Sequence, residues 1–308
     1  MRDSQENRFR EIFRRAHASH GACRSDEWLM SPCTAPDGTP VTPLVWSRRN
    51  GPWRRVETLW VGAAPGNAGG RGRGDQGAHG TRIPFGGDIA GANLDALLGS
   101  IGIDRNDTFL VAALNRLPDA GGGEPGLREL LQPVGAYASS IELLRDTVVA
   151  AGPGLIITLG IVGLRTLASA LTQEDLSNAT LPTLCRLERV GFKRDALNEW
   201  PVEALPLSET FQTRWQQAWG EDQVWVLPLM HPSGQNMSPY ARIQTAFHQR
   251  MVVTRDALRK AYSERFRRAV PASRAPYADH GIYALPEWRL RVGPRHRELD
   301  ALWRAKGI

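Results

Sequence analysis

Short apolar runs alternate along the chain with segments that have helical periodicity. Four of these runs predict strands, which are Val56–Ala63, Asp107–Ala113, Leu155–Leu159 and Gln223–Leu229. Helices are predicted at about Ala90–Ser100, within Leu127–Ala150 and from Gly160 to about Leu171. Strands that are apolar throughout and alternate with helices indicate a parallel sheet covered on both faces. The sequence therefore predicts an α/β fold, a three-layer α/β/α sandwich with a central, mostly parallel four-stranded sheet.

The other segments suggest how the chain is divided. A long helix is predicted after the fourth strand, because Ser238-Pro239 supplies an N-cap and a first-turn proline. Residues 1–44 are interpreted as an N-terminal extension, and residues 269–308, which are basic and rich in proline, as a C-terminal one. The α/β/α domain is then expected to span residues 45–268. Residues 172–221 show no regular pattern.

An uncharged stretch from Thr147 to Leu164 approaches the length of a membrane-spanning helix. Gly152-Pro153-Gly154 interrupts it, so a helix end, a turn and a buried strand are expected instead of a membrane span. The first residues lack the apolar core of a secretory signal. The expectation is a cytoplasmic, nucleoid-associated monomer without a membrane partner.

The net charge of +6 is concentrated near the C-terminus. Arg255–Ile308 contains 13 Lys or Arg against 6 Asp or Glu, a net charge of +7. Nearly all of the basic residues in the chain are arginines, whose planar guanidinium groups bind phosphates bidentately and stack on bases. This composition favours a nucleic-acid partner, although arginines on solvated helix faces would give the same charge.

Three cysteines are too few for a disulfide-stapled scaffold or for a four-thiolate iron–sulfur cluster. His17, His20, Cys23 and Cys33 could form a mixed zinc site. The long spacing between the cysteines favours the interpretation that these are ordinary surface residues. No metal and no cofactor are therefore expected.

Gly72–Gly77 matches the dinucleotide-binding pattern G-x-G-x-x-G. That pattern binds a pyrophosphate only where it joins a strand directly to a helix. Here the predicted strand ends about ten residues earlier, and the glycines and proline that follow prevent a helix from starting. No Gly-Lys-Ser/Thr phosphate loop follows Gly66 either. A nucleotide-dependent oxidoreductase on a Rossmann fold remains an alternative that cofactor binding would reveal.

Three loops follow the carboxyl ends of predicted strands, where parallel sheets bind ligands. The first contains Gly62–Gly66 and Ile83–Asp88, the second contains Asn115, and the third is His231–Met237. Together they bring a carboxylate, an amide, an aromatic ring and an imidazole to one edge. An amide can read a base edge, a ring can stack on it, and an imidazole can stabilise a developing oxyanion.

These segments resemble, in their order, the signature motifs of the uracil-DNA glycosylase superfamily. The motifs are Gly62–Gly66, Pro84–Gly87, Phe109–Asn115, Ile156–Gly160 and His231–Ser233. The first loop and the His-Pro-Ser-x-Gln-Asn sequence are most similar to family five, the B type of thermophiles. The chain departs from that family because it lacks the iron–sulfur cysteines and carries a Gly/Arg insertion at Ala68–Gly77.

The resemblance implies an enzyme that flips uracil, and possibly other deaminated bases, out of DNA and hydrolyses the N-glycosidic bond in base excision repair. It implies that Asp88 and His231 are catalytic, and that Phe85, Asn115 and the backbone at Ala64 bind the base. The residues expected to contact DNA are Pro65, Gly66, Ser233, Gln235, Asn236, Met237 and Arg242. Among these, Met237 would be an apolar wedge.

The partner implied is DNA that contains uracil or another deaminated base. A second alternative is a superfamily member that binds lesions or single-stranded DNA without cutting. It stays open because Ala63 and Ala64 stand where other families place an acid or an amide.

Overall fold

The computed structural model describes the parts of the chain that form the central sheet and its covering helices. These are residues 55–63, 89–100, 109–113, 136–174, 203–232 and 244–267, together with positions 8, 11, 12, 33, 34, 40, 41, 102 and 176. The strands are β1 (Cys33–Thr34), β2 (Pro40–Val41), β3 (Thr58–Gly62), β4 (Phe109–Ala112), β5 (Leu155–Leu159), β6 (Glu203–Leu205) and β7 (Val224–Leu229). The helices are α3 (Ile89–Ser100), α5 (Ala136–Ala151), α6 (Ile161–Thr172), α8 (Glu209–Trp219) and α10 (Gln244–Phe266).

The central sheet has five strands in the order β4-β3-β5-β7-β6. β4, β3, β5 and β7 pair in parallel, and β6 pairs with β7 in the antiparallel sense. Parallel neighbours cannot be joined by a tight turn, so the connections between the parallel strands must cross over a face of the sheet. Separately, β1 and β2 form a small antiparallel pair.

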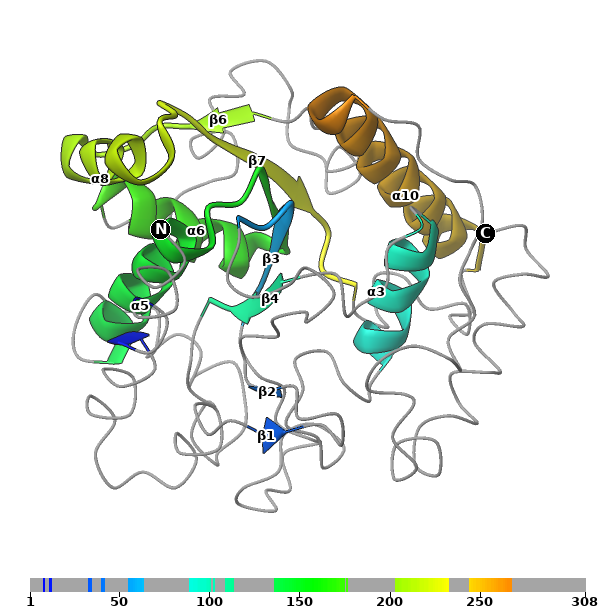
Figure 1. The fold of residues 1–308 in the computed structure, drawn as a ribbon. Helices are drawn as coiled ribbons and strands as arrows, with labels where there is room; N and C mark the ends of the chain where they lie inside the picture. Colours follow the sequence, from blue (N-terminus) through cyan, green and yellow to red (C-terminus); the bar gives the residue numbers. More distant parts are fainter. Residues whose placement is uncertain are drawn as a thin grey trace.

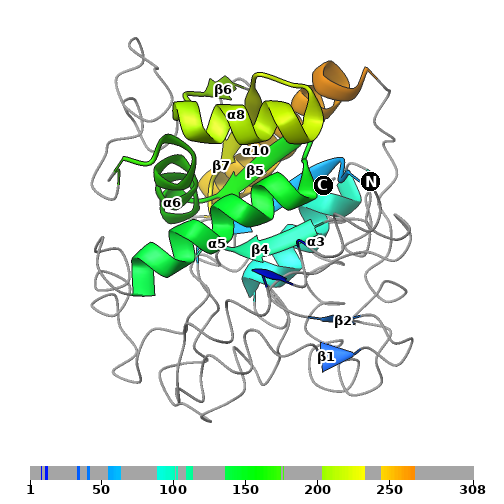
Figure 2. The same ribbon diagram turned by 60° about the vertical axis from the view of Figure 1, so that its left-hand side comes forward.

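Helices cover both faces of the sheet (Figures 1 and 2). α5, α6 and α8 lie on one side, and α3 and α10 lie on the other. The predicted α/β class with three layers is therefore confirmed, but the sheet has five strands where four were predicted, because β6 adds one. None of the described helices combines the length and the apolar character that crossing a membrane requires.

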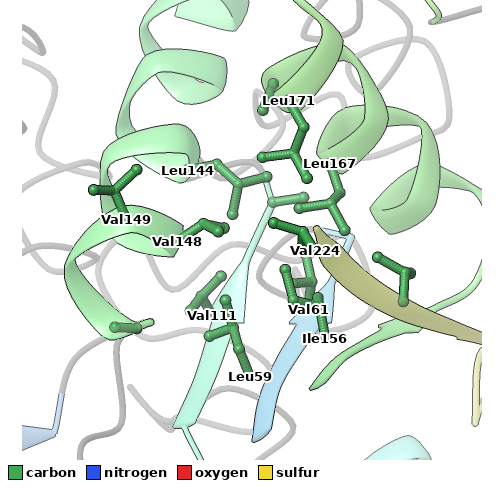
Figure 3. Close-up of a cluster of buried hydrophobic side chains, with 14 of the residues drawn as sticks. Leu59, Val61, Val111, Leu144, Val148, Val149, Ile156, Leu167, Leu171 and Val224 are labelled. Carbon is green, nitrogen blue, oxygen red and sulfur yellow. The ribbon is translucent and has the colours of Figure 1, made fainter. Parts of the chain in front are cut away.

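Two apolar cores result from the alternation of side chains along each strand. Leu59 and Val61 point toward α5 and α6, where they meet Leu144, Val148 and Leu167 in a cluster without solvent exposure (Figure 3). Trp60 and Ile157 are fully buried but stand outside that cluster, as expected for side chains on the opposite face. That second face packs against buried residues of the two other helices, which are Leu94, Leu97 and Leu98 of α3 and Leu258, Ala261 and Tyr262 of α10.

A buried polar group fastens α10 to the sheet. The Tyr262 hydroxyl donates to Oγ1 of Thr58 at 2.8 Å, and the Trp60 Nε1 group donates to the same oxygen at 3.2 Å. Thr58 is 3% exposed, so this oxygen accepts both hydrogen bonds in the interior of the protein. Leu258 and Tyr262, which are four residues apart on α10, are both fully buried.

Two arginines hold the turn between α5 and β5, at the end of the sheet where the parallel strands begin. Arg55 donates from Nε to the Gly152 carbonyl at 2.7 Å, and Arg265 donates from Nε to the Gly154 carbonyl at 2.8 Å. Both Nη groups of Arg55 also contact the Glu221 carboxylate at 2.6 Å, which is the bidentate geometry that guanidinium groups favour. These hydrogen bonds lower the pKa of Glu221 below its ordinary value, and burial opposes them.

The structure adds elements that the sequence pattern did not predict. Residues 172–221 show no regular pattern in sequence, yet they contain β6 and α8. The signals for α8 are present in retrospect: the Ser208 hydroxyl caps the helix by accepting from the Phe211 N–H, and Gly220 ends it in the left-handed region. β6 has three residues and gains its regularity only by pairing with β7.

The position of β6 also explains a proline inside β7. The described residues of β6 pair with Val224–Val226, so within the described part of the chain no strand pairs with the outer side of β7 at Pro228. The Leu229 carbonyl accepts from the Gly160 N–H, so the backbone of Leu229 faces β5 and that of Pro228 faces outward. A proline at that point removes no hydrogen bond between the described strands.

Two further predictions concern the ends of the domain. The predicted N-cap of the last helix, Ser238-Pro239, lies outside the described residues, and α10 is described from Gln244 onward. Ile12, from the segment interpreted as an N-terminal extension, is 4% exposed and belongs to the core cluster on the α5 and α6 side. At least this part of residues 1–44 contributes to the packed domain.

Candidate active site

The carboxyl ends of the four parallel strands lie at one edge of the sheet. The register pairs Gly62 at the end of β3 with Ala112 at the end of β4, and Leu159 of β5 with Leu229 of β7. Backbone hydrogen bonds extend both pairings by one step. The Ala113 N–H donates to the Gly62 carbonyl, and the Gly160 N–H donates to the Leu229 carbonyl, each at 2.8 Å. The loops that carry the predicted site residues therefore leave the sheet from one edge.

His231 follows β7 at this edge and packs directly against Gly160. Gly160 has φ 86° and ψ 169°, a backbone conformation that is almost exclusive to glycine. A Cβ atom at this position would lie 2.9 Å from the Cβ of His231. The Leu-Gly at the end of β5 thus has a physical role, because only a residue without a side chain lets the imidazole sit over the end of this strand. His231 is half-buried in this position.

α3, which lies on the side of the sheet opposite α5 and α6, contacts the segment that follows β7. The Asn93 Nδ2 group donates to the backbone carbonyl of Pro232 at 2.8 Å, and the Asn93 side chain has no solvent exposure. A carbonyl can only accept, so the amide must present its nitrogen to it. The amino-terminal half of α3 is in this way placed beside the segment that carries His231.

The family model described as the uracil DNA glycosylase superfamily matches residues 50–253, which is more than half of the chain. The chain belongs to the uracil DNA glycosylase superfamily. The parallel sheet and the His-Pro segment at its carboxyl edge agree with this membership. Among curated proteins, none matches the chain. The resemblance to family five in particular stays a prediction.

Of the predicted site residues, the structure describes His231, which follows the carboxyl end of β7. Its catalytic role stays a prediction. The other predicted residues lie outside the described ranges, and these are Ala64, Pro65, Gly66, Phe85, Asp88, Asn115, Ser233, Gln235, Asn236, Met237 and Arg242. Several of them are joined to described anchors. Ala64 follows Ala63 at the end of β3, Asp88 precedes the first residue of α3, and Ser233 follows Pro232.

Asn93 was missed by sequence reasoning, although a signal was available. On an amphipathic helix the positions i, i+1, i+4 and i+5 lie on one face, which is the buried one. In α3 these positions are Asn93, Leu94, Leu97 and Leu98. An amide at a buried position of an otherwise apolar helix needs a partner, so it points to a specific hydrogen bond. The identity of that partner, 139 residues further along the chain, depends on the tertiary fold.

Within the described ranges, no three His, Cys, Asp or Glu side chains gather closely enough to hold a metal ion. His17, His20 and Cys23, which could have formed a mixed zinc site, lie outside those ranges, and Cys33 is described in its backbone only. The interpretation of these four as ordinary surface residues therefore stays a prediction.

Proposed function

We propose that this protein removes uracil from DNA by hydrolysing the N-glycosidic bond, after flipping the base out of the helix. Membership of the superfamily supports a DNA substrate and a glycosylase reaction. The observation that carries the proposal is the placement of His231 against Gly160, at the sheet edge where β3, β4, β5 and β7 end. Flipping is required because the glycosidic carbon is inaccessible within a duplex.

His231 would stabilise the leaving base. As the bond to the sugar breaks, negative charge develops on the uracil ring and its O2 atom becomes a stronger acceptor. A neutral imidazole that donates an N–H to O2 strengthens its hydrogen bond in the transition state, and such an interaction accelerates the reaction without tightening substrate binding. The contact with Gly160 supports this role because it limits where the imidazole can lie.

Asp88 would stabilise the sugar cation or orient the attacking water, as carboxylates do at oxocarbenium centres. The hydrogen bond from Asn93 to Pro232 supports a position close to His231. Ile89 begins α3 four residues before Asn93, which is about 6 Å along a helix axis, and Asp88 immediately precedes Ile89. Asp88 would thus stand next to the start of the helix that Asn93 joins to the His-Pro segment.

The remaining residues would bind the flipped nucleotide and the strand around it. The Phe85 ring would stack on the base, and the Asn115 amide would pair with its polar edge. The backbone at Ala64 would bind the base, whereas backbone N–H groups around Gly66, the Ser233 hydroxyl and Arg242 would contact phosphates. The gap left in the base stack would be filled by Gln235, Asn236 and Met237, with Met237 as the apolar wedge.

The experiment that tests this function is single-turnover excision on oligonucleotides that contain uracil, hypoxanthine, xanthine or a thymine mismatch, in single and double strands. Uracil should be released from DNA, and an abasic site should remain. His231→Ala and Asp88→Asn should each slow the chemical step by about 10²–10³-fold while DNA affinity changes little. The matched control is Thr147→Val, which alters a buried residue of α5 that takes no part in the reaction.

A specific feature favours one other function for the same site. Ala63 and Ala64 stand where other families of the superfamily place an acid or an amide, so the chain could bind a lesion or single-stranded DNA without cutting it. Tight binding of uracil-containing DNA with no release of any base in the panel would establish that function. Release of uracil that is unaffected by Asp88→Asn would move the carboxylate role to Asp75.

A further inference from the structure

The backbone around His231 is anchored on both sides by groups from distant parts of the chain. Before His231, the Leu229 carbonyl accepts from the Gly160 N–H at 2.8 Å. After it, the Pro232 carbonyl accepts from the Asn93 amide at 2.8 Å. Two hydrogen bonds thus enclose a segment of four residues, and the imidazole lies between them.

The sequence of this segment leaves little freedom between the two anchors. The proline ring fixes φ of Pro232, and a residue that precedes proline is restricted to extended conformations. The rotation that mainly remains is ψ of Pro232, which sets the direction of the Pro232 carbonyl. The hydrogen bond from Asn93 fixes that direction, and with it the path of the chain past His231.

The environment of Asn93 imposes an energetic cost on its amide. The side chain is completely buried among leucines of α3, and among the described residues its Oδ1 atom has no hydrogen-bond partner. An unsatisfied buried acceptor is unfavourable, and a leucine in this stripe would avoid it. The donor Nδ2 is the part of the amide that has a partner, and this partner is the residue next to His231.

We infer that Asn93 is a positioning residue for His231. It holds the Pro232 carbonyl so that the imidazole keeps its orientation toward the leaving base, and it acts through His231 without touching the substrate. This inference rests on the proposed function. It adds to that function a residue of α3, on the far side of the sheet from the helix that follows Gly160.

The first test is a double-mutant cycle in the full-length chain. Asn93→Leu should slow single-turnover uracil excision by about 10²-fold, because a displacement of about 1 Å at a reacting group costs that much, and DNA affinity should stay nearly constant. Asn93→Leu combined with His231→Ala should be no slower than His231→Ala alone, since a positioning residue has nothing left to position. Equal losses in both backgrounds would overturn the inference.

The matched control is again Thr147→Val, which removes another buried hydrogen bond from a side chain to a backbone carbonyl. The Thr147 hydroxyl donates to the Leu143 carbonyl of α5 at 2.7 Å, on the side of the sheet opposite α3 (Figure 1). This variant should excise uracil at the wild-type rate. A loss of rate that matched Asn93→Leu would mean that any buried hydrogen bond is needed, and would refute positioning.

A second readout does not depend on excision. The ring signals of His231 in a histidine NMR spectrum can be assigned by their disappearance in His231→Ala. Asn93→Leu should shift these signals, and Thr147→Val should leave them in place. If wild-type protein releases no uracil, the proposed function fails, and the NMR comparison still decides whether Asn93 orients His231. Unchanged ring signals in Asn93→Leu would overturn the inference.

Discussion

Replacing Gly160 by alanine tests whether the end of β5 shapes the active site. The φ and ψ angles of Gly160, 86° and 169°, lie in a region that costs a residue with a side chain about 1–3 kcal/mol. The new Cβ would also lie 2.9 Å from the His231 Cβ, whereas carbon atoms in contact prefer about 3.5–4.0 Å. The histidine must therefore move by roughly 0.5–1 Å. We expect Gly160→Ala to lose about 1–3 kcal/mol in the free energy of unfolding and about 10²-fold in excision rate.

Urea unfolding and single-turnover excision measure the two effects separately. Gly220→Ala is the matched control, because Gly220 also has a positive φ, 71°, but nothing lies within 4 Å of its Cβ position. This control should lose about 1 kcal/mol of stability and keep the wild-type excision rate. If Gly160→Ala excised uracil at the wild-type rate, or if both variants lost rate equally, the contact between Gly160 and His231 would not determine turnover.

Three further predictions concern stability and DNA binding. Thr58→Val should lower the free energy of unfolding by about 2–4 kcal/mol, because it removes the buried oxygen to which the Trp60 Nε1 group and the Tyr262 hydroxyl both donate. Urea unfolding measures this loss, and a loss below about 1 kcal/mol would contradict the prediction. The lowered pKa of Glu221 means that its ion pair with Arg55 stabilises the fold above the ordinary carboxyl pKa of 4.5 and is lost as the pH falls through the lowered value. The stability difference between wild type and Glu221→Gln should accordingly be largest at neutral pH and shrink below pH 4.5, and a difference independent of pH would argue against this pair. Deleting residues 270–308, which belong to the basic C-terminal stretch, should flatten the salt dependence of DNA affinity and leave the ranking of excised bases unchanged. A switch of the preferred base would refute a role limited to phosphate contacts.

Much of the fold follows from local patterns in the sequence. β5 is found at Leu155–Leu159, where the apolar run between Gly154 and Gly160 predicts it, and β3, β4 and β7 lie within the runs that predict them. Each of these strands is buried on both faces, so its sequence is apolar throughout and can be recognised without knowledge of its neighbours. The order of motifs along these strands was also sufficient to indicate the superfamily.

β6 and the role of Asn93 depended on the tertiary structure. β6 has only three residues, and its extended form is stabilised by a partner strand that no local pattern reveals. The Asn93 amide can be recognised as unusual within an apolar helix, but its partner lies on another element.

Gly160 combines both kinds of information. Its identity is visible at the end of an apolar run, and a glycine there is a general sign of a turn. That it makes room for His231 follows only from the parallel pairing of β5 with β7, which brings the ends of the two strands together. A sequence can specify which residues a site contains through local chemistry, whereas the distances between those residues are set by strand order, because only packing brings together groups that are far apart along the chain.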